Sequence, residues 1–148
     1  MRSWLFVPAD SERKIAKAMG SGADALILDL EDSVSPERRP VARGMAADFI
    51  KAARAAERRP LLYVRINPVD GADWEADLAG VMDAIPDGII QPKPHSGDDV
   101  HKLSIALGHA EERRNGDGPQ TRILPIVTEV PDSVLALQSY IGASSRTV

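Results

Sequence analysis

The sequence contains no cysteine and few aromatic residues. Without cysteine among the 148 residues, disulfides, thiolate metal ligands and cysteine nucleophiles are all excluded. Aromatic residues make up 4% of the chain, too few for a surface on which single-stranded nucleic acid stacks. The net charge of −4 offers no basic excess to a polyanion, so we predict that the protein binds no nucleic acid.

Long apolar runs are also missing. The N-terminal stretch MRSWLFVPADSER is interrupted at Pro8, which makes its apolar part too short for a signal sequence or a membrane span. We therefore expect no membrane segment and a cytoplasmic location. Hydrophobic residues make up 43% and charged residues 27%, as in an ordinary globular domain with its own core.

Apolar segments alternate with helical patterns along the whole chain. We predict strands at residues 4–7, 25–30, 61–66, 88–91 and 123–127. A helix is predicted after each strand. The first starts at Asp10 or Ser11, and the others lie after Pro36 and at 74–85, 96–114 and 131–140. The helix after Pro36 has Val41, Met45, Phe49, Ala52 and Ala56 on its apolar face, and the helix at 96–114 has Ser96 and Asp99 in capping-box spacing. A polar loop is expected at 115–120. This alternation predicts an α/β protein with a parallel sheet covered by helices.

Polar side chains recur where the predicted strands end. No G-x-G-x-x-G motif or P-loop follows any strand, which weakens the case for a nucleotide-binding doubly wound sheet. Polar groups from successive strand ends instead form the active site of a (β/α) barrel, so we predict a (β/α)8 TIM barrel. These strand-end residues are Asp29, Glu31, Arg65, Asn67, Lys93 and Glu129.

The number of strands falls short of a complete barrel, which needs eight strands and about 250 residues. We expect residues 1–148 to be a single domain, the N-terminal portion of a longer barrel with about five strand–helix units. A self-sufficient open sheet is the alternative.

Five segments, in order and at the right spacing, resemble the citrate lyase β-subunit and malyl-CoA lyase family of metal-dependent aldolases, also known as the HpcH/HpaI aldolase family. They are RSWLFVPADSERKIAKA at 2–18, GADALILDLEDSVSPERRPVAR at 22–43, VRIN at 64–67, GIIQPKP at 88–94 and PIVTEVPDSV at 125–134. The chain departs from the family pattern at Pro94-His95, where the family often reads Pro-Lys-Val followed by Glu or Ser. His95 itself is expected to be a solvated loop residue.

The resemblance implies a trimeric or hexameric barrel enzyme that uses Mg²⁺. Such enzymes cleave or form a carbon–carbon bond in citryl, malyl or related thioesters of coenzyme A or an acyl carrier. By position, Arg65 matches the arginine that grips the oxo acid, and Glu129 matches a metal-binding carboxylate. The family's second metal-binding residue is an aspartate in a G-A-E-D-L-like segment that would follow residue 148. A partner-binding remnant without catalysis and a pyruvate-type aldolase acting on free aldehydes are the rival functions.

The residues themselves support parts of this chemistry. Glu129 suits Mg²⁺, although a carboxylate before a helix can also serve the helix dipole. Arg65 has a planar fork for a carboxylate, and it can equally form a structural ion pair with Asp29 or Glu31. Strand alternation places Asp29 and Glu31 on one side, so we predict that both orient Arg65 and the water shell of the metal.

Three further residue sets have weaker predictions. Asp32, with Ser33, is expected to fix the turn into the next helix. Lys93 can bind a substrate carboxylate or phosphate, or can pair with Glu31 or Glu129. The basic residues Arg13, Lys14 and Lys17 are either a solvated helix face or a contact for the phosphates of a thioester carrier.

Overall fold

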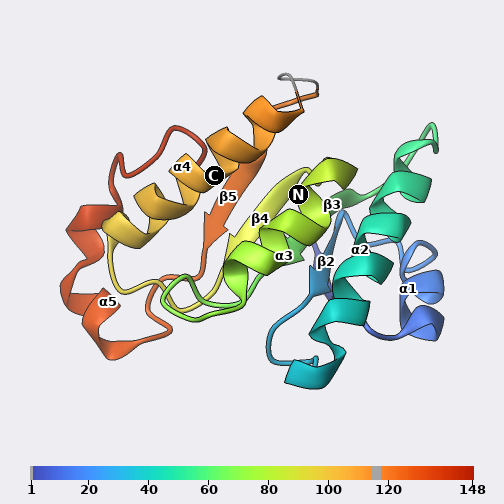
Figure 1. The fold of residues 1–148 in the computed structure, drawn as a ribbon, viewed down its shortest axis with the longest axis horizontal. Coiled ribbons are helices and arrows are strands. Elements are labelled where there is room, and N and C mark those ends of the chain that lie inside the picture. Colours follow the sequence, from blue (N-terminus) through green and yellow to red (C-terminus); the bar gives the residue numbers. More distant parts are fainter. Residues whose placement is uncertain (1, 115–117) are drawn as a thin grey trace.

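The strands of the protein form one parallel sheet. The computed structural model describes residues 2–114 and 118–148; residues 115–117 of the predicted polar loop lie outside the described residues. Within this part of the chain the sheet has five strands in sequence order, all parallel (Figure 1). They are β1 (Trp4–Pro8), β2 (Ala25–Asp29), β3 (Leu61–Arg65), β4 (Gly88–Gln91) and β5 (Arg122–Pro125). The predicted α/β class with a parallel sheet is confirmed.

A helix follows each strand. They are α1 (Glu12–Ala18), α2 (Arg39–Arg54), α3 (Trp74–Val81), α4 (Gly97–Arg113) and α5 (Pro131–Leu135), with 3-10 segments at Pro36–Arg38, Met82–Ala84 and Leu137–Tyr140. The helix predicted at 74–85 is α-helical to Val81 and continues as the 3-10 segment to Ala84, and Ile85, with a positive φ of 59°, ends it. The helix predicted at 131–140 is divided, since Ala136 departs from helical geometry with φ −99° and ψ 11°. Ser96 caps α4 by accepting a hydrogen bond from the backbone N–H of Asp98, but the Asp99 carboxylate reaches His95 rather than Ser96, so the predicted capping box does not close.

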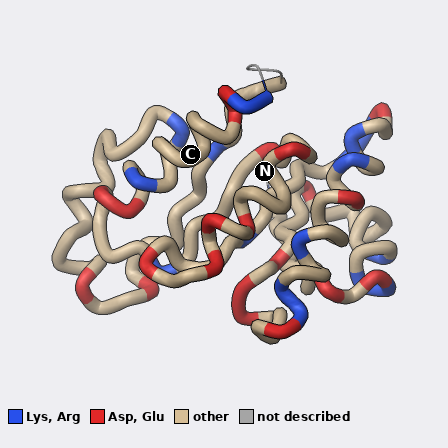
Figure 2. The backbone as a smooth tube through the Cα atoms, in the orientation of Figure 1, with Lys and Arg blue, Asp and Glu red and all other residues tan. Residues whose placement is uncertain are grey.

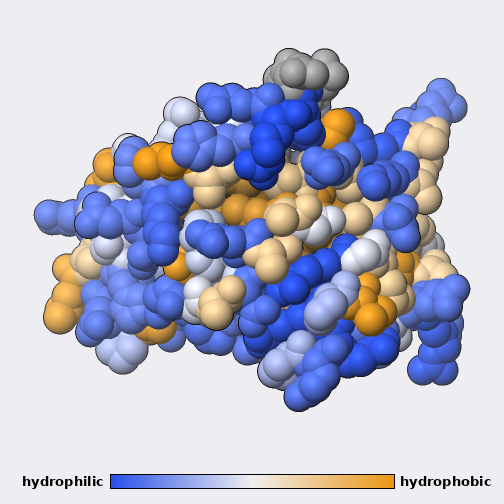
Figure 3. Space-filling model, in the orientation of Figure 1, coloured by the Kyte–Doolittle hydropathy of each residue, from blue (hydrophilic) through white to orange (hydrophobic). Residues whose placement is uncertain are grey.

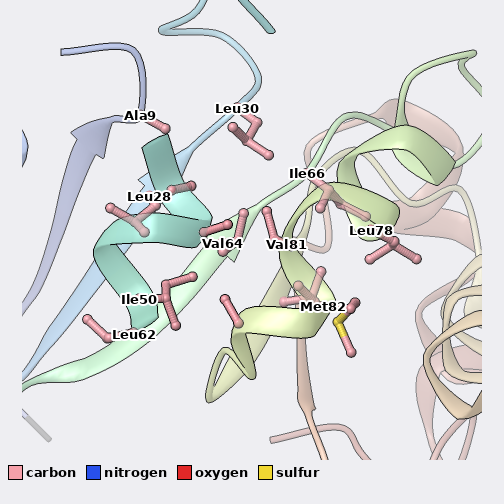
Figure 4. Close-up of a cluster of buried hydrophobic side chains, with 14 of the residues drawn as sticks. Ala9, Leu28, Leu30, Ile50, Leu62, Val64, Ile66, Leu78, Val81 and Met82 are labelled. Carbon is pink, nitrogen blue, oxygen red and sulfur yellow. The ribbon is translucent and has the colours of Figure 1, made fainter. Parts of the chain in front are cut away.

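The main core lies between the sheet and the helices. Strand residues at alternate positions, such as Leu28 and Val64, point toward α2 and α3 (Figure 4). Helix residues such as Ile50 and Val81 meet them, and all four side chains are fully buried. Burial of an aliphatic side chain contributes about 1.5–3 kcal/mol, so this layer supplies much of the stability of the fold.

The apolar face of α2 is not the predicted one. Val41 is 46% exposed, whereas its neighbour Ala42 is fully buried. The buried positions of the helix are Ala42, Ala46, Ala47, Ile50 and Ala53. Small alanine side chains let the helix backbone approach the sheet closely, and the larger Met45 and Phe49 pack at the flank of the core.

The opposite face of the sheet carries a second, smaller apolar cluster. Ile27, Tyr63 and Ile90 form it, and the Trp4 ring meets the Tyr63 ring edge-on at 4.9 Å between centroids. Gly88 is needed beside Tyr63, because a Cβ atom there would lie 2.1 Å from the tyrosine Cε1. This face is the one that a closed barrel turns inward.

The helix-covered side of the molecule is mostly hydrophilic, with apolar patches between the helices (Figure 3). Among the residues that the structure describes, no helix combines the length and apolar character needed to cross a bilayer.

Candidate functional site

Arg65 and Asp29 form a bidentate ion pair where β2 and β3 end. The two residues are register partners in the parallel ladder, so their side chains leave the sheet side by side. Arg65 donates from Nε to Asp29 Oδ1 at 2.7 Å and from Nη2 to Oδ2 at 2.8 Å. The Asp29 side chain is 2% exposed and that of Arg65 is 11% exposed. The predicted role of Asp29 in orienting Arg65 therefore has a direct geometric basis.

Asp29 also fixes the turn that follows β2. Its carboxylate accepts hydrogen bonds from the backbone N–H groups of Glu31, at 3.0 Å, and Ser33, at 3.1 Å. Burial raises the pKa of Asp29, but these bonds and those from Arg65 outweigh it and hold the pKa below its usual range. The turn was predicted to depend on Asp32; that prediction is wrong, because the side chain that holds it is Asp29 and the Asp32 carboxylate points toward Arg65 and Lys93.

Glu31 joins Arg65 to Lys93. Its Oε2 atom lies 3.0 Å from Nη1 of Arg65, and its Oε1 atom accepts a hydrogen bond from Nζ of Lys93 at 2.5 Å. The side chain is 4% exposed, and this burial raises the pKa of Glu31, although Lys93 and Arg65 oppose the shift. The Glu31 bond in turn raises the pKa of Lys93, so the lysine stays charged. Of the two readings of Lys93, the structure shows the ion pair.

Part of the Arg65 guanidinium remains available to a ligand. A guanidinium has five N–H donors, and Asp29 takes one from Nε and one from Nη2. Nη1 lies 3.0 Å from Glu31 Oε2 and makes a long bond of 3.5 Å to Asp32, whose side chain is 60% exposed, so the second N–H of Nη2 is the donor without a partner among the described residues. The Phe6 ring lies 4.8 Å from the guanidinium carbon and supports it from one side. Sequence reasoning missed this contact, which depends on the pairing of β1 with β2.

Glu129 enters the same cluster through the backbone of Lys93. Its Oε2 atom accepts the Lys93 N–H at 2.8 Å, while the residue as a whole is exposed. Lys93 has φ 49° and Thr128 has φ 68°, left-handed conformations that bring the turns after β4 and β5 together. The hydrogen bond of Glu129 goes to Lys93, and the helix that follows, α5, is five residues long.

The turn that carries Glu129 has its own support. Ser133 is fully buried and accepts the Thr128 N–H at 2.9 Å, while its hydroxyl donates to the Val130 carbonyl at 2.7 Å. A side chain that bridges the turn in this way holds the Glu129 backbone in place. The carboxylate therefore projects from a fixed base.

The donor set is compatible with Mg²⁺ but does not enclose it. Among the described residues no group of three or more His, Asp or Glu side chains is arranged to hold a metal. Mg²⁺ keeps several waters and needs only one or two carboxylates together with substrate oxygens. Glu129 fits one such ligand, because its Oε1 atom accepts no hydrogen bond from the described part of the chain and its side chain reaches solvent.

Arg13 and Lys14 do not join the strand-end cluster. Both are exposed on α1, and neither forms an ion pair with another described residue. Lys14 lines an open trough of about 300 Å³ beside β1, together with Phe6, Pro8 and Lys17. Because Phe6 also touches Arg65, the trough begins next to the site.

His95 is exposed, as predicted, but has charged neighbours. Its ring nitrogens lie 3.6 Å from Asp70 and 3.5 Å from Asp132, which follow β3 and begin α5. Loop residues that are distant in the sequence thus meet above the strand ends, which no local pattern indicates.

The chain is similar to proteins of known sequence and structure. At 34% identity over 106 residues, 72% of the chain aligns with 36% of a (3S)-malyl-CoA thioesterase from Cereibacter sphaeroides. At 27% identity, 99% of the chain aligns with 50% of the citrate lyase subunit beta of Haemophilus influenzae. The chain thus spans between a third and a half of the length of these curated relatives.

Solved structures show the same fold. CitE from Mycobacterium tuberculosis, solved with magnesium and acetoacetate, superposes with a TM-score of 0.71 at 28% identity, over 98% of this chain and 51% of that one. The same protein with magnesium, acetoacetate and coenzyme A gives a TM-score of 0.64 at 28% identity, over 98% of this chain and 45% of that one. The family model described as HpcH/HpaI aldolase/citrate lyase matches residues 2–146, and the chain belongs to this family.

Proposed function

We propose that the chain carries part of the active site of a Mg²⁺-dependent carbon–carbon lyase. Its substrate would be a 3-hydroxyacyl thioester such as malyl-CoA or citryl-CoA, which it would cleave to an acetyl thioester and an oxo acid, or form in the reverse direction. The observation that carries the proposal is the unbroken series of contacts from Arg65 through Glu31 and Lys93 to Glu129. It brings the ends of β3, β4 and β5 into one charged cluster.

Arg65 would bind the oxo-acid half of the substrate. Asp29 holds the fork by two short bonds, so the guanidinium plane is set before a ligand arrives. The second N–H of Nη2 can then meet the oxygen on which negative charge changes during the reaction. Glu31 and Asp32 balance the charge of Arg65 and Lys93 in the absence of substrate.

Glu129 would hold Mg²⁺ with one carboxylate oxygen, and bound Mg²⁺ would stabilise the negative charge of the substrate oxygens. The Lys93 N–H takes Oε2 of the carboxylate, and Oε1 accepts no hydrogen bond from the described part of the chain. This use of the metal is supported by the magnesium-bound relatives of known structure. A second carboxylate from another part of a longer barrel, and the trimeric or hexameric assembly, belong to the same proposal.

Cleavage leaves the oxidation states balanced. The substrate hydroxyl gives up its proton and becomes the carbonyl of the oxo acid, and the adjacent carbon–carbon bond breaks. Its electron pair passes to the carbon next to the thioester, where a proton completes the acetyl group. The residues of this chain hold the oxo-acid oxygens, and the basic trough with Lys14, Lys17 and nearby Arg13 would meet the phosphates of the carrier.

Hydrolysis of the thioester is a second candidate, because the Cereibacter sphaeroides relative is a thioesterase that shares 34% identity over 106 residues. The two reactions give different products from malyl-CoA. A lyase releases acetyl-CoA and glyoxylate, whereas a thioesterase releases free coenzyme A and malate.

The test is to incubate the protein with malyl-CoA or citryl-CoA, with Mg²⁺ or with EDTA, and to separate the products by chromatography. We expect acetyl-CoA and an oxo acid in equal amounts, only when Mg²⁺ is present. Free coenzyme A without an oxo acid would establish the hydrolase instead. Binding of the thioesters without any product would indicate a binding module and contradict both enzymes.

A further inference from the structure

A buried polar network lies behind the strand ends, on the helix side. Asp77 of α3 is fully buried, and Asn67, two residues beyond Arg65, is 3% exposed. Asp77 accepts a bond from Nε of Arg43 on α2 at 2.7 Å through Oδ1, and bonds from the backbone N–H and Nδ2 of Asn67 at 2.7 and 2.8 Å through Oδ2. Acidic and basic segments lie close together where α2 and α3 run side by side (Figure 2).

Asn67 extends the strand ladder with its side chain. The Leu30 N–H donates to the Arg65 carbonyl at 3.0 Å, so regular parallel pairing would next have the Leu30 carbonyl accept the Asn67 N–H. That N–H is instead directed to Asp77. The Asn67 Nδ2 group takes its place and donates to the Leu30 carbonyl at 3.1 Å.

This substitution connects the network to the candidate site. Leu30 stands between Asp29 and Glu31, the two acids that face Arg65. A bond to the Leu30 carbonyl therefore fixes the backbone from which both acids project. On the other strand, the Asn67 N–H donates to Asp77, and this bond fixes the backbone just beyond Arg65.

A neighbouring ion pair joins the same two helices without reaching the strand ends. Arg39 on α2 pairs with Asp73 at 2.6 Å, and Asp73 is part exposed at the start of α3. This pair also joins α2 to α3, yet it reaches neither Asn67 nor Leu30. A buried ion pair alone is weak evidence of stabilisation, so the reach of the Asp77 network to the strand ends is its distinguishing property.

We propose that Asn67, held by Asp77 and Arg43, is a positioning residue that sets the geometry of Arg65 against Asp29 and Glu31. It acts through the backbone and touches no substrate. The proposal rests on the proposed function only where it concerns oxo-acid binding; the geometry of the Arg65 pair can be observed without any ligand.

The first measurement is the ¹⁵N–¹H NMR signal of Arg65 Nε, which reports the bond to Asp29. Asp29→Asn supplies the position of this signal in a weakened pair. We expect Asn67→Ala to move the signal toward that position and Arg43→Lys to move it less, in the same direction. Arg39→Gln is the matched control, because Arg39 bonds the Asp73 oxygen that Arg43 does not use and reaches neither Asp77 nor Asn67, so its loss should leave the signal unchanged.

The second measurement is binding of pyruvate with Mg²⁺ by calorimetry. We expect Asn67→Ala to weaken it roughly 10-fold and Arg39→Gln to leave it unaltered. If the wild-type protein binds no pyruvate, the proposed function fails, and the NMR signal still decides the positioning role. An unchanged Arg65 signal in Asn67→Ala overturns the inference; if that variant does not fold, an unchanged signal in Arg43→Lys does so.

Discussion

Arg65 and Arg43 are two arginines with nearly equal burial and different tasks. Their side chains are 11% and 14% exposed, and each makes two side-chain bonds to carboxylates at 2.7–2.8 Å. Arg43 lies between two helices and donates hydrogen bonds to the carboxylates of Asp77 and Asp73 and to the Asp73 carbonyl. Arg65 directs Nη1 to Glu31 and to the exposed Asp32 at the strand ends. Burial therefore does not distinguish the two arginines, whereas the position of their partners, between two helices or at the strand ends, does.

The largest loss of stability should follow from removing the carboxylate that Arg43 binds at Asp77. Asp77→Ala removes the fully buried partner of Arg43 Nε and of the Asn67 backbone N–H, so we expect the free energy of unfolding to fall by about 3–5 kcal/mol. Urea denaturation measures it. Asp73→Ala is the control, because Asp73 is part exposed and its loss should cost about 1 kcal/mol or less. Equal losses in the two variants would contradict the assigned difference in burial.

Substitution of Arg65 should lower the activity of the protein more than its stability. Arg65→Lys keeps the charge but loses the fork, so we expect turnover of a malyl or citryl thioester to fall on the order of 100-fold. Stability measured in urea should fall by less than it does in Asp77→Ala. Full activity of Arg65→Lys would refute the substrate-binding role.

The magnesium response should separate Glu129 from the rest of the cluster. Saturating Mg²⁺, at a hundred times its Kd, should stabilise the protein by about 2.7 kcal/mol, which raises its melting temperature. Glu129→Gln should abolish that gain and change stability without metal by no more than about 0.5 kcal/mol, because the residue is exposed. Asp10→Asn is a control, because the Asp10 carboxylate pairs with Arg38 and not with a residue of the charged cluster. An undiminished Mg²⁺ gain in Glu129→Gln would exclude it as a ligand.

The pH dependence should sharpen the contrast between the two buried acids. The folded pKa of Asp29 lies below its unfolded value, so its contribution is complete above about pH 5 and is lost as the pH falls through the folded pKa. Glu31 has the opposite sign: its folded pKa is raised, so its contribution declines as the pH rises from the unfolded to the folded pKa.

Asp29→Asn should therefore flatten the acid limb of the stability curve, and Glu31→Gln should steepen it, because the opposing slope is removed. Urea unfolding at a series of acidic pH values measures both slopes. Identical slopes in the two variants would contradict the assigned pKa directions.

Much of the site follows from strand alternation, which the sequence displays directly. Asp29 and Glu31 face Arg65 because alternate residues share a side and because Asp29 and Arg65 end neighbouring strands. The same alternation puts Asp32 on the side of Leu28 and Leu30, whereas the turn after β2 brings its carboxylate back to Arg65 and Lys93.

The remaining contacts depend on features that no local pattern carries. The hydrogen bond between Glu129 and the Lys93 N–H requires left-handed backbone at Lys93 and Thr128, and neither lysine nor threonine indicates that conformation in a sequence. On α2, counting large apolar residues favoured Val41, whereas close helix–sheet packing buries Ala42. Asn67 stood in a recognised segment, VRIN, but its replacement of a ladder bond becomes visible only with α3 in place.

The left-handed conformation of Thr128 has a consequence for anyone who evolves this protein for heat resistance. A β-branched residue with φ 68° costs on the order of 1–3 kcal/mol, and glycine would relieve most of that cost. The same replacement would loosen the corner that aims Glu129. Selection for thermal endurance alone would thus favour glycine at position 128, whereas selection that also preserves the position of Glu129 would keep the threonine.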